Sequence, residues 1–168
     1  MTAEPSKLPP TPPEKLYQEG IVAGGIGAAT MAIWFLLWDA IQGRPLHTPT
    51  VLGTALFRWG EGFGSPESLS HNLQMVLMCT WVHGLTFCAI GGMAARLLGW
   101  VEENQNLGFG ALLLVVIFMY GFIFVFSLFA EQVLQALTLP AILVGNLLAA
   151  AAMGAYFWRR HPSLTMRP

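Results

Sequence analysis

The chain contains, at Gly20 to Ile41, the nearly unbroken apolar run GIVAGGIGAATMAIWFLLWDAI. About 20 such residues in a helix span the ~30 Å hydrocarbon core of a bilayer. The run lacks the alternation of a barrel strand, and a helix satisfies its own backbone in lipid. Three later runs have the same character, at Asn72 to Trp100, Leu107 to Ala130 and Thr138 to Trp158. We therefore predict an all-α integral membrane four-helix bundle.

The composition agrees with a membrane location. Of 168 residues, 55% are hydrophobic and 10% are charged, whereas a soluble domain carries about 25% charged residues. The formal net charge is −1, so the chain has no basic excess with which to displace counterions from a phosphate backbone. Lipid is the expected surrounding, and nucleic acid is excluded as a partner.

The predicted organisation has three parts. Residues 1–16 form a Pro-rich tail, residues 17–160 form the transmembrane domain, and residues 161–168 form a C-terminal tail. Within the first loop, Thr48 and Pro49 are typical of a helix start. They predict a short interfacial helix that runs through Phe57.

The basic residues predict the orientation. Six lie on one side of the predicted crossings, at Lys7, Lys15, Arg96, Arg159, Arg160 and Arg167. Arg44 and Arg58 alone lie on the other side. Cytoplasmic loops are richer in Lys and Arg, so we expect both termini in the cytoplasm.

Small residues predict where helices meet. In the first helix they include Gly20, Gly24 and Gly27, and in the fourth helix Gly145 and Gly154. Transmembrane helices approach closely at such faces. Such a face can pack against another helix of this chain or against a partner protein, and the sequence does not distinguish between these two possibilities.

A seam of polar residues is predicted inside the bundle. On the second helix Asn72, Cys79, His83 and Thr86 fall on one face at helical spacing. On the third helix Tyr120, Ser127 and Glu131 cluster opposite a phenylalanine stripe. His83 and Tyr120 come to similar depth, so a hydrogen bond between them is a hypothesis. The seam is the candidate ion or proton path.

His83 is the main candidate for a functional group, because ionisable residues inside a membrane are costly. Its imidazole fits three roles: a purely structural hydrogen bond to Tyr120 or a carbonyl, contact with a cofactor or quinone, and proton transfer. The structural hydrogen bond is the role we favour. His83 and Tyr120 are the candidate cofactor-binding residues, and the sequence names no cofactor.

Charges also gather at the outer interface, where we place Asp39, Arg44 and Arg58. Asp39 and Glu131 are expected to pair with the arginines, or alternatively to mark the mouth of an ion path. A divalent site built from Asp39, Glu131, His71 and Glu67 lacks diagnostic spacing. We expect no metal site.

The junction WFLLWDAIQGRPLHTPTVLG, within Gly20 to Phe57, resembles small four-helix bacterial inner-membrane proteins of uncharacterised function. Their pattern is a glycine-rich first helix, a WFLxxDxxxGRPLxTPxxLG junction and a later histidine in the second helix. The resemblance covers about a quarter of the chain. It implies a bacterial source and a multi-pass protein of the inner membrane, and it carries no functional residue with it.

No catalytic motif is present: the chain has no HExxH, CxxC, GxSxG or phosphate-binding loop. Cys79 and Cys88 fall on different faces of one predicted helix and cannot pair. We therefore expect no catalytic residues and a non-catalytic accessory subunit of a bioenergetic membrane complex, respiratory or photosynthetic. Its expected contacts are membrane lipid, other subunits and a quinone or pigment. The alternative is a small oligomeric proton or ion channel or transporter using His83, Tyr120 and Glu131.

Overall fold

The computed structural model describes residues 13–58, 72–103 and 139–161, and these residues are all-α. They form helices α1 (Pro13–Ile41), α2 (His47–Arg58), α3 (Leu73–Glu103) and α6 (Leu139–Arg160). The helices α1, α3 and α6 are long and apolar enough to cross a membrane. Three of the four predicted crossings therefore coincide with helices of membrane-spanning length. The fourth, Leu107 to Ala130, lies outside the described residues.

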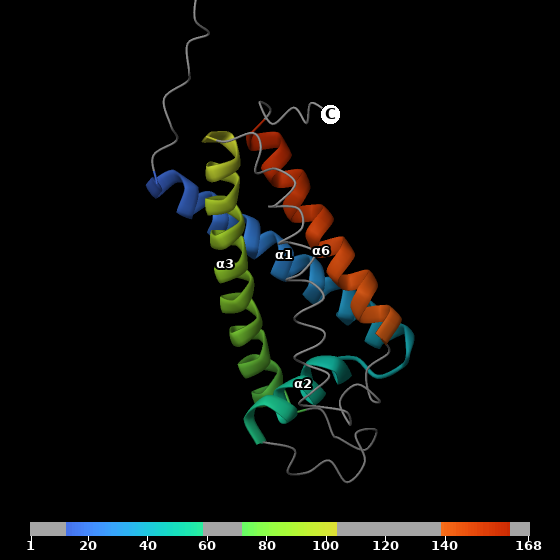
Figure 1. The fold of residues 1–168 in the computed structure, drawn as a ribbon. Helices are drawn as coiled ribbons and strands as arrows, with labels where there is room; N and C mark the ends of the chain where they lie inside the picture. The colour runs from blue at the N-terminus through green and yellow to red at the C-terminus, as the bar shows by residue number, and fades with distance from the viewer. Residues whose placement is uncertain (1–12, 59–71, 104–138, 162–168) are drawn as a thin grey trace, which may run out of the picture.

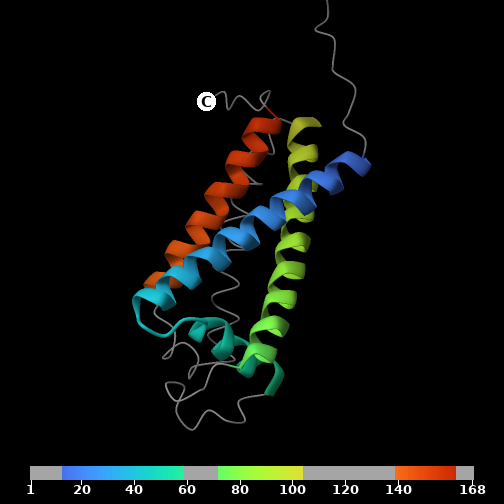
Figure 2. The same ribbon diagram turned by 180° about the vertical axis from the view of Figure 1, so that it is seen from behind.

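The helix α1 is central among the described helices (Figures 1 and 2). It crosses α3 steeply along its first half and packs along α6. The helix α2 lies at the end of the bundle where α1 ends and α3 begins, and it packs against α3. It spans nearly the residues predicted for the interfacial helix.

The crossing of α1 and α3 is a contact between backbones. A Cβ built on Gly20 would lie 2.6 Å from the Cα of Gly92, and one on Gly24 would lie 2.7 Å from the Cα of Cys88. Gly91 faces Gly20 and Gly24 from the α3 side. Lipid gives no hydrophobic drive for helix association, so packing depends on this close approach.

The contact between α1 and α6 is different, because large side chains of α1 cover small residues of α6. A Cβ on Gly145 would lie 2.7 Å from the Met31 sulfur and 2.8 Å from the Trp34 ring. The indole N–H of Trp34 also donates a 2.8 Å hydrogen bond to the carbonyl of Ala141. Gly154 has open space around it, with nothing within 4 Å. Gly145 thus serves internal packing, and Gly154 faces outward.

The Trp34 hydrogen bond gives a first prediction. Trp34→Phe keeps an aromatic ring but removes the donor, so we expect it to lower the free energy of unfolding by about 0.5–1.5 kcal/mol. Denaturation in mixed micelles, followed by circular dichroism, measures the change. Trp158→Phe is the control, because Trp158 is 65% exposed. Equal effects of the two substitutions would contradict the assignment.

Polar contacts join the three long helices at one end of the bundle. Where α1 begins and α6 ends, His161 Nε2 lies 3.0 Å from a Glu19 carboxylate oxygen. At the same end, Arg96 of α3 donates to the Tyr17 hydroxyl of α1. These contacts hold the starting turns of α1 against the ends of both other long helices.

Candidate functional site

The His83 side chain of α3 lies against α1. The backbone of Ala28 on α1 lies near its imidazole, and the ring of Phe87 lies beside it, tilted by 49° with the ring centroids 4.6 Å apart. The Nε2 atom is buried and has no hydrogen-bond partner among the described residues. His83 therefore sits where α3 lies against α1.

The other predicted seam residues of α3 have different partners. Asn72 accepts hydrogen bonds from the backbone N–H groups of Gln74 and Met75 at 3.1 and 3.4 Å, which makes it the N-cap of α3. Thr86 donates to the carbonyl of Val82 in its own helix at 2.8 Å. Cys79, half-buried with a free thiol, remains one turn before His83. Among the described seam residues, Cys79 and His83 are the two that remain once Asn72 and Thr86 are assigned to the backbone of α3.

The third-helix members of the seam are Tyr120, Ser127 and Glu131, and all three lie outside the described residues. The His83 to Tyr120 hydrogen bond therefore stays a prediction. The three roles expected for His83 also stay predictions.

The outer-interface residue Asp39 has a structural role. Its carboxylate is buried, with the residue 3% exposed, and accepts hydrogen bonds from the Thr48 N–H at 2.7 Å and the Thr48 hydroxyl at 2.6 Å. It thereby satisfies a free N–H in the first turn of α2 and places a negative charge at the positive end of that helix. Asp39 links the end of α1 to the start of α2.

The contacts of the two outer-interface arginines differ from the predicted pairing with Asp39. Across residues 13–58, 72–103 and 139–161, no ion pair joins Asp39 to Arg44 or Arg58. Arg44 instead donates its backbone N–H to the Asp39 carbonyl at 2.9 Å, within the turn before α2. Arg58 lies in the last turn of α2, where a cation is favoured by the helix dipole.

Several polar contacts were not predicted. The Glu19 to His161 and Tyr17 to Arg96 contacts join residues far apart in the chain, so only a knowledge of the helix crossing reveals them. Asn146 is a half-buried amide inside the Pro140–Arg160 span. The sequence does show it, as a strongly polar residue within an apolar run. Like His83, it lies in a helix long and apolar enough to cross a membrane.

The described residues contain no group of three or more His, Cys, Asp or Glu side chains that could hold a metal ion. No family model, curated protein or solved structure matches the chain.

Proposed function

We propose that the chain is a non-catalytic accessory subunit of a larger complex in the bacterial inner membrane, of the kind that handles electrons or protons. It forms a four-helix bundle, with both termini in the cytoplasm, and it meets its neighbours through apolar helix faces. Contact with a quinone or pigment is part of the same proposal. The proposal includes the prediction, made from the Gly20 to Phe57 stretch, that the chain is similar to bacterial four-helix inner-membrane proteins.

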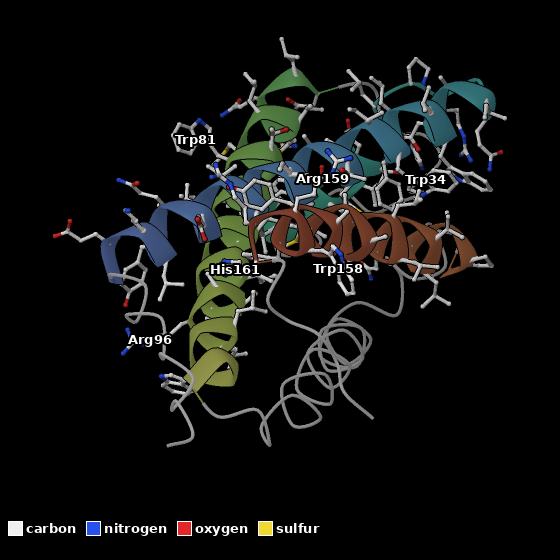
Figure 3. The ribbon with its side chains drawn as sticks, turned by 90° about the horizontal axis from the view of Figure 1, so that it is seen from above. Trp34, Trp81, Arg96, Trp158, Arg159 and His161 are labelled. Atoms are coloured by element: carbon white, nitrogen blue, oxygen red, sulfur yellow. The ribbon has the colours of Figure 1, made fainter. Side chains whose placement is uncertain are left out.

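The observation that carries the proposal is the exposure of Trp81. It is 71% exposed and points from α3 away from α6 (Figure 3). It lies eight residues into α3, about 12 Å along the helix from the first residue. Tryptophan is enriched in protein interfaces, because its large ring buries apolar area and its N–H finds a partner. An uncovered Trp ring on this face of α3 therefore suits contact with a neighbouring protein.

The distribution of charge supports the orientation. Lys15, Arg96, Arg159 and Arg160 lie toward the end of the bundle where α1 starts and where α3 and α6 end, and Arg44 and Arg58 lie toward the other end. The positive-inside rule assigns the first end to the cytoplasm.

Photo-crosslinking in the native membrane tests the proposal. We expect p-benzoylphenylalanine at position 81, in place of Trp81, to capture a different polypeptide in the native host. The same residue in place of Phe87, which packs against the core between the helices, is expected to capture none. Capture of lipid alone at position 81, in a variant with the circular dichroism and elution of the native chain, would contradict the proposal.

No observation among the described residues favours the channel alternative. It depends on Tyr120 and Glu131, which lie outside them, while Asn72 and Thr86 make their hydrogen bonds to the backbone of α3.

A further inference from the structure

Arg96 is the first charged residue of α3 after a stretch that is long enough to cross a membrane. Residues 73–95 contain no Asp, Glu, Lys or Arg, and about 20 residues span the hydrocarbon core. The Arg96 side chain is exposed, and it points away from α6 at the end of the bundle where α3 ends (Figure 3). When α3 crosses a membrane, this cation lies beside the lipid headgroups and not among the acyl chains.

Two aromatic side chains hold the Arg96 guanidinium in place. Its Nη1 donates a hydrogen bond to the hydroxyl of Tyr17 on α1. Its Cζ lies over the Trp100 ring, 5.9 Å from the ring centroid, a distance at which an aromatic face attracts a cation. The two residues are themselves 47% and 52% exposed. The guanidinium is therefore fixed at the surface where α1 and α3 meet, and it remains accessible.

This arrangement leaves hydrogen-bond donors for an anion. A guanidinium has five N–H donors, and the Tyr17 oxygen accepts one of them. Because that oxygen is the acceptor, the Tyr17 O–H proton is left to donate to another group. Guanidinium N–H groups match two oxygens of one phosphate. Arg96 and Tyr17 thus present N–H and O–H donors side by side.

No carboxylate that the structure describes forms an ion pair with Arg96. The Glu19 carboxylate of α1 lies 3.0 Å from His161 Nε2. On α3, Glu102 and Glu103 follow Arg96 by six and seven residues, which is about 9–10 Å along the helix. The positive charge of Arg96 is therefore open to a negatively charged ligand.

We propose that Arg96 and Tyr17 bind the phosphate of an anionic phospholipid where α1 and α3 meet the membrane surface. Phospholipid phosphate is the anion that a membrane supplies at this level, and basic residues beside a crossing helix attract anionic headgroups. Phosphatidylcholine adds a quaternary ammonium close to its phosphate, which the guanidinium repels. Phosphatidylglycerol adds no positive charge, so the site should prefer it.

Lipid titration followed by native mass spectrometry tests the proposal. The full chain, purified in detergent and stripped of lipid, is titrated with phosphatidylglycerol and separately with phosphatidylcholine of the same acyl chains. We expect the native chain to bind phosphatidylglycerol at least about fivefold more tightly, because one basic residue at a membrane surface attracts anionic lipid by about that factor. This comparison needs no variant.

Three variants locate the preference. Arg96→Gln should weaken binding of phosphatidylglycerol by about 10-fold or more, because it removes hydrogen bonds from a charged group. Tyr17→Phe removes one neutral donor and should weaken it by about 2- to 10-fold. Arg159→Gln is the matched control, since it removes the same charge from an exposed side chain at the same end of the bundle. It should weaken binding by less than about fivefold.

Equal binding of the two lipids by the native chain would overturn the proposal. So would native affinity for phosphatidylglycerol in Arg96→Gln or Tyr17→Phe. Equal losses in Arg96→Gln and Arg159→Gln would also overturn it, because they would show a diffuse attraction to the basic end of the bundle. The proposal rests on the membrane crossing of α3 and not on partner proteins, so the lipid site and the accessory-subunit role can fail separately.

Discussion

Gly24→Val is expected to cost more than about 3 kcal/mol of the free energy of unfolding and to separate α1 from α3. A Cβ at Gly24 would lie 2.7 Å from both the Cα of Cys88 and the carbonyl carbon of Phe87. Overpacking a core usually costs about 1–3 kcal/mol when side chains can move. Here the obstacle is the backbone of a neighbouring helix, which cannot turn away, so the cost should exceed that range.

Gly25→Val is the matched control for this substitution. Gly25 is the next residue of α1 and has nothing within 4 Å of a built Cβ, so the same change of side chain meets no neighbour there. Unfolding by SDS in mixed micelles, followed by circular dichroism, compares the two variants. Equal losses of stability would show that helix propensity, and not the contact with α3, determines the effect.

Asp39→Ala is expected to destabilise the protein by about 2–3 kcal/mol. The substitution removes both hydrogen bonds to Thr48. The buried N–H and hydroxyl of Thr48 are then left without their acceptor. Hydrogen bonds to charged groups contribute about 1.5–3 kcal/mol, and loss of a helix cap costs about 0.5–2 kcal/mol. Because Asp39 belongs to α1, its loss should loosen α2 from the end of the bundle.

Hydrogen–deuterium exchange of α2 measures this loosening. The amides of His47–Arg58 should exchange faster in Asp39→Ala. Asp39→Asn keeps one acceptor oxygen without the charge and should have a smaller effect. Adding Thr48→Val to Asp39→Ala should lower the stability little further, because the hydroxyl hydrogen bond that Thr48→Val removes is already lost in Asp39→Ala. Unchanged exchange of α2 in Asp39→Ala would refute its role as the cap.

Hydropathy and turn chemistry were sufficient to predict the described helices. The apolar run after Gly20 predicts α1, and Thr48 with Pro49 predicts a helix through Phe57, which is observed as His47–Arg58. The start of α1 was predicted less accurately than the starts of the other described helices. The helix α1 begins at Pro13, ahead of the apolar run, because Glu14 to Glu19 continue the helix beyond the predicted span.

The site residues were harder to predict, because helical periodicity gives the face of a residue and not its partner. Asn72 shares a face with His83 on an ideal helix, yet its position at the helix start makes it a cap. Gly145 and Gly154 look equivalent in sequence, and only the position of α1 shows that Gly145 is covered. The same holds for Asp39, whose partner Thr48 depends on the turn between α1 and α2.

The composition of the native particle tests the central claim most directly. The chain, carrying an affinity tag, is extracted from its own membrane in a styrene–maleic acid copolymer without detergent and is examined by native mass spectrometry. If it is an accessory subunit, the particle should contain this chain together with other polypeptides in fixed ratio. A particle that contains only this chain and lipid would contradict the claim.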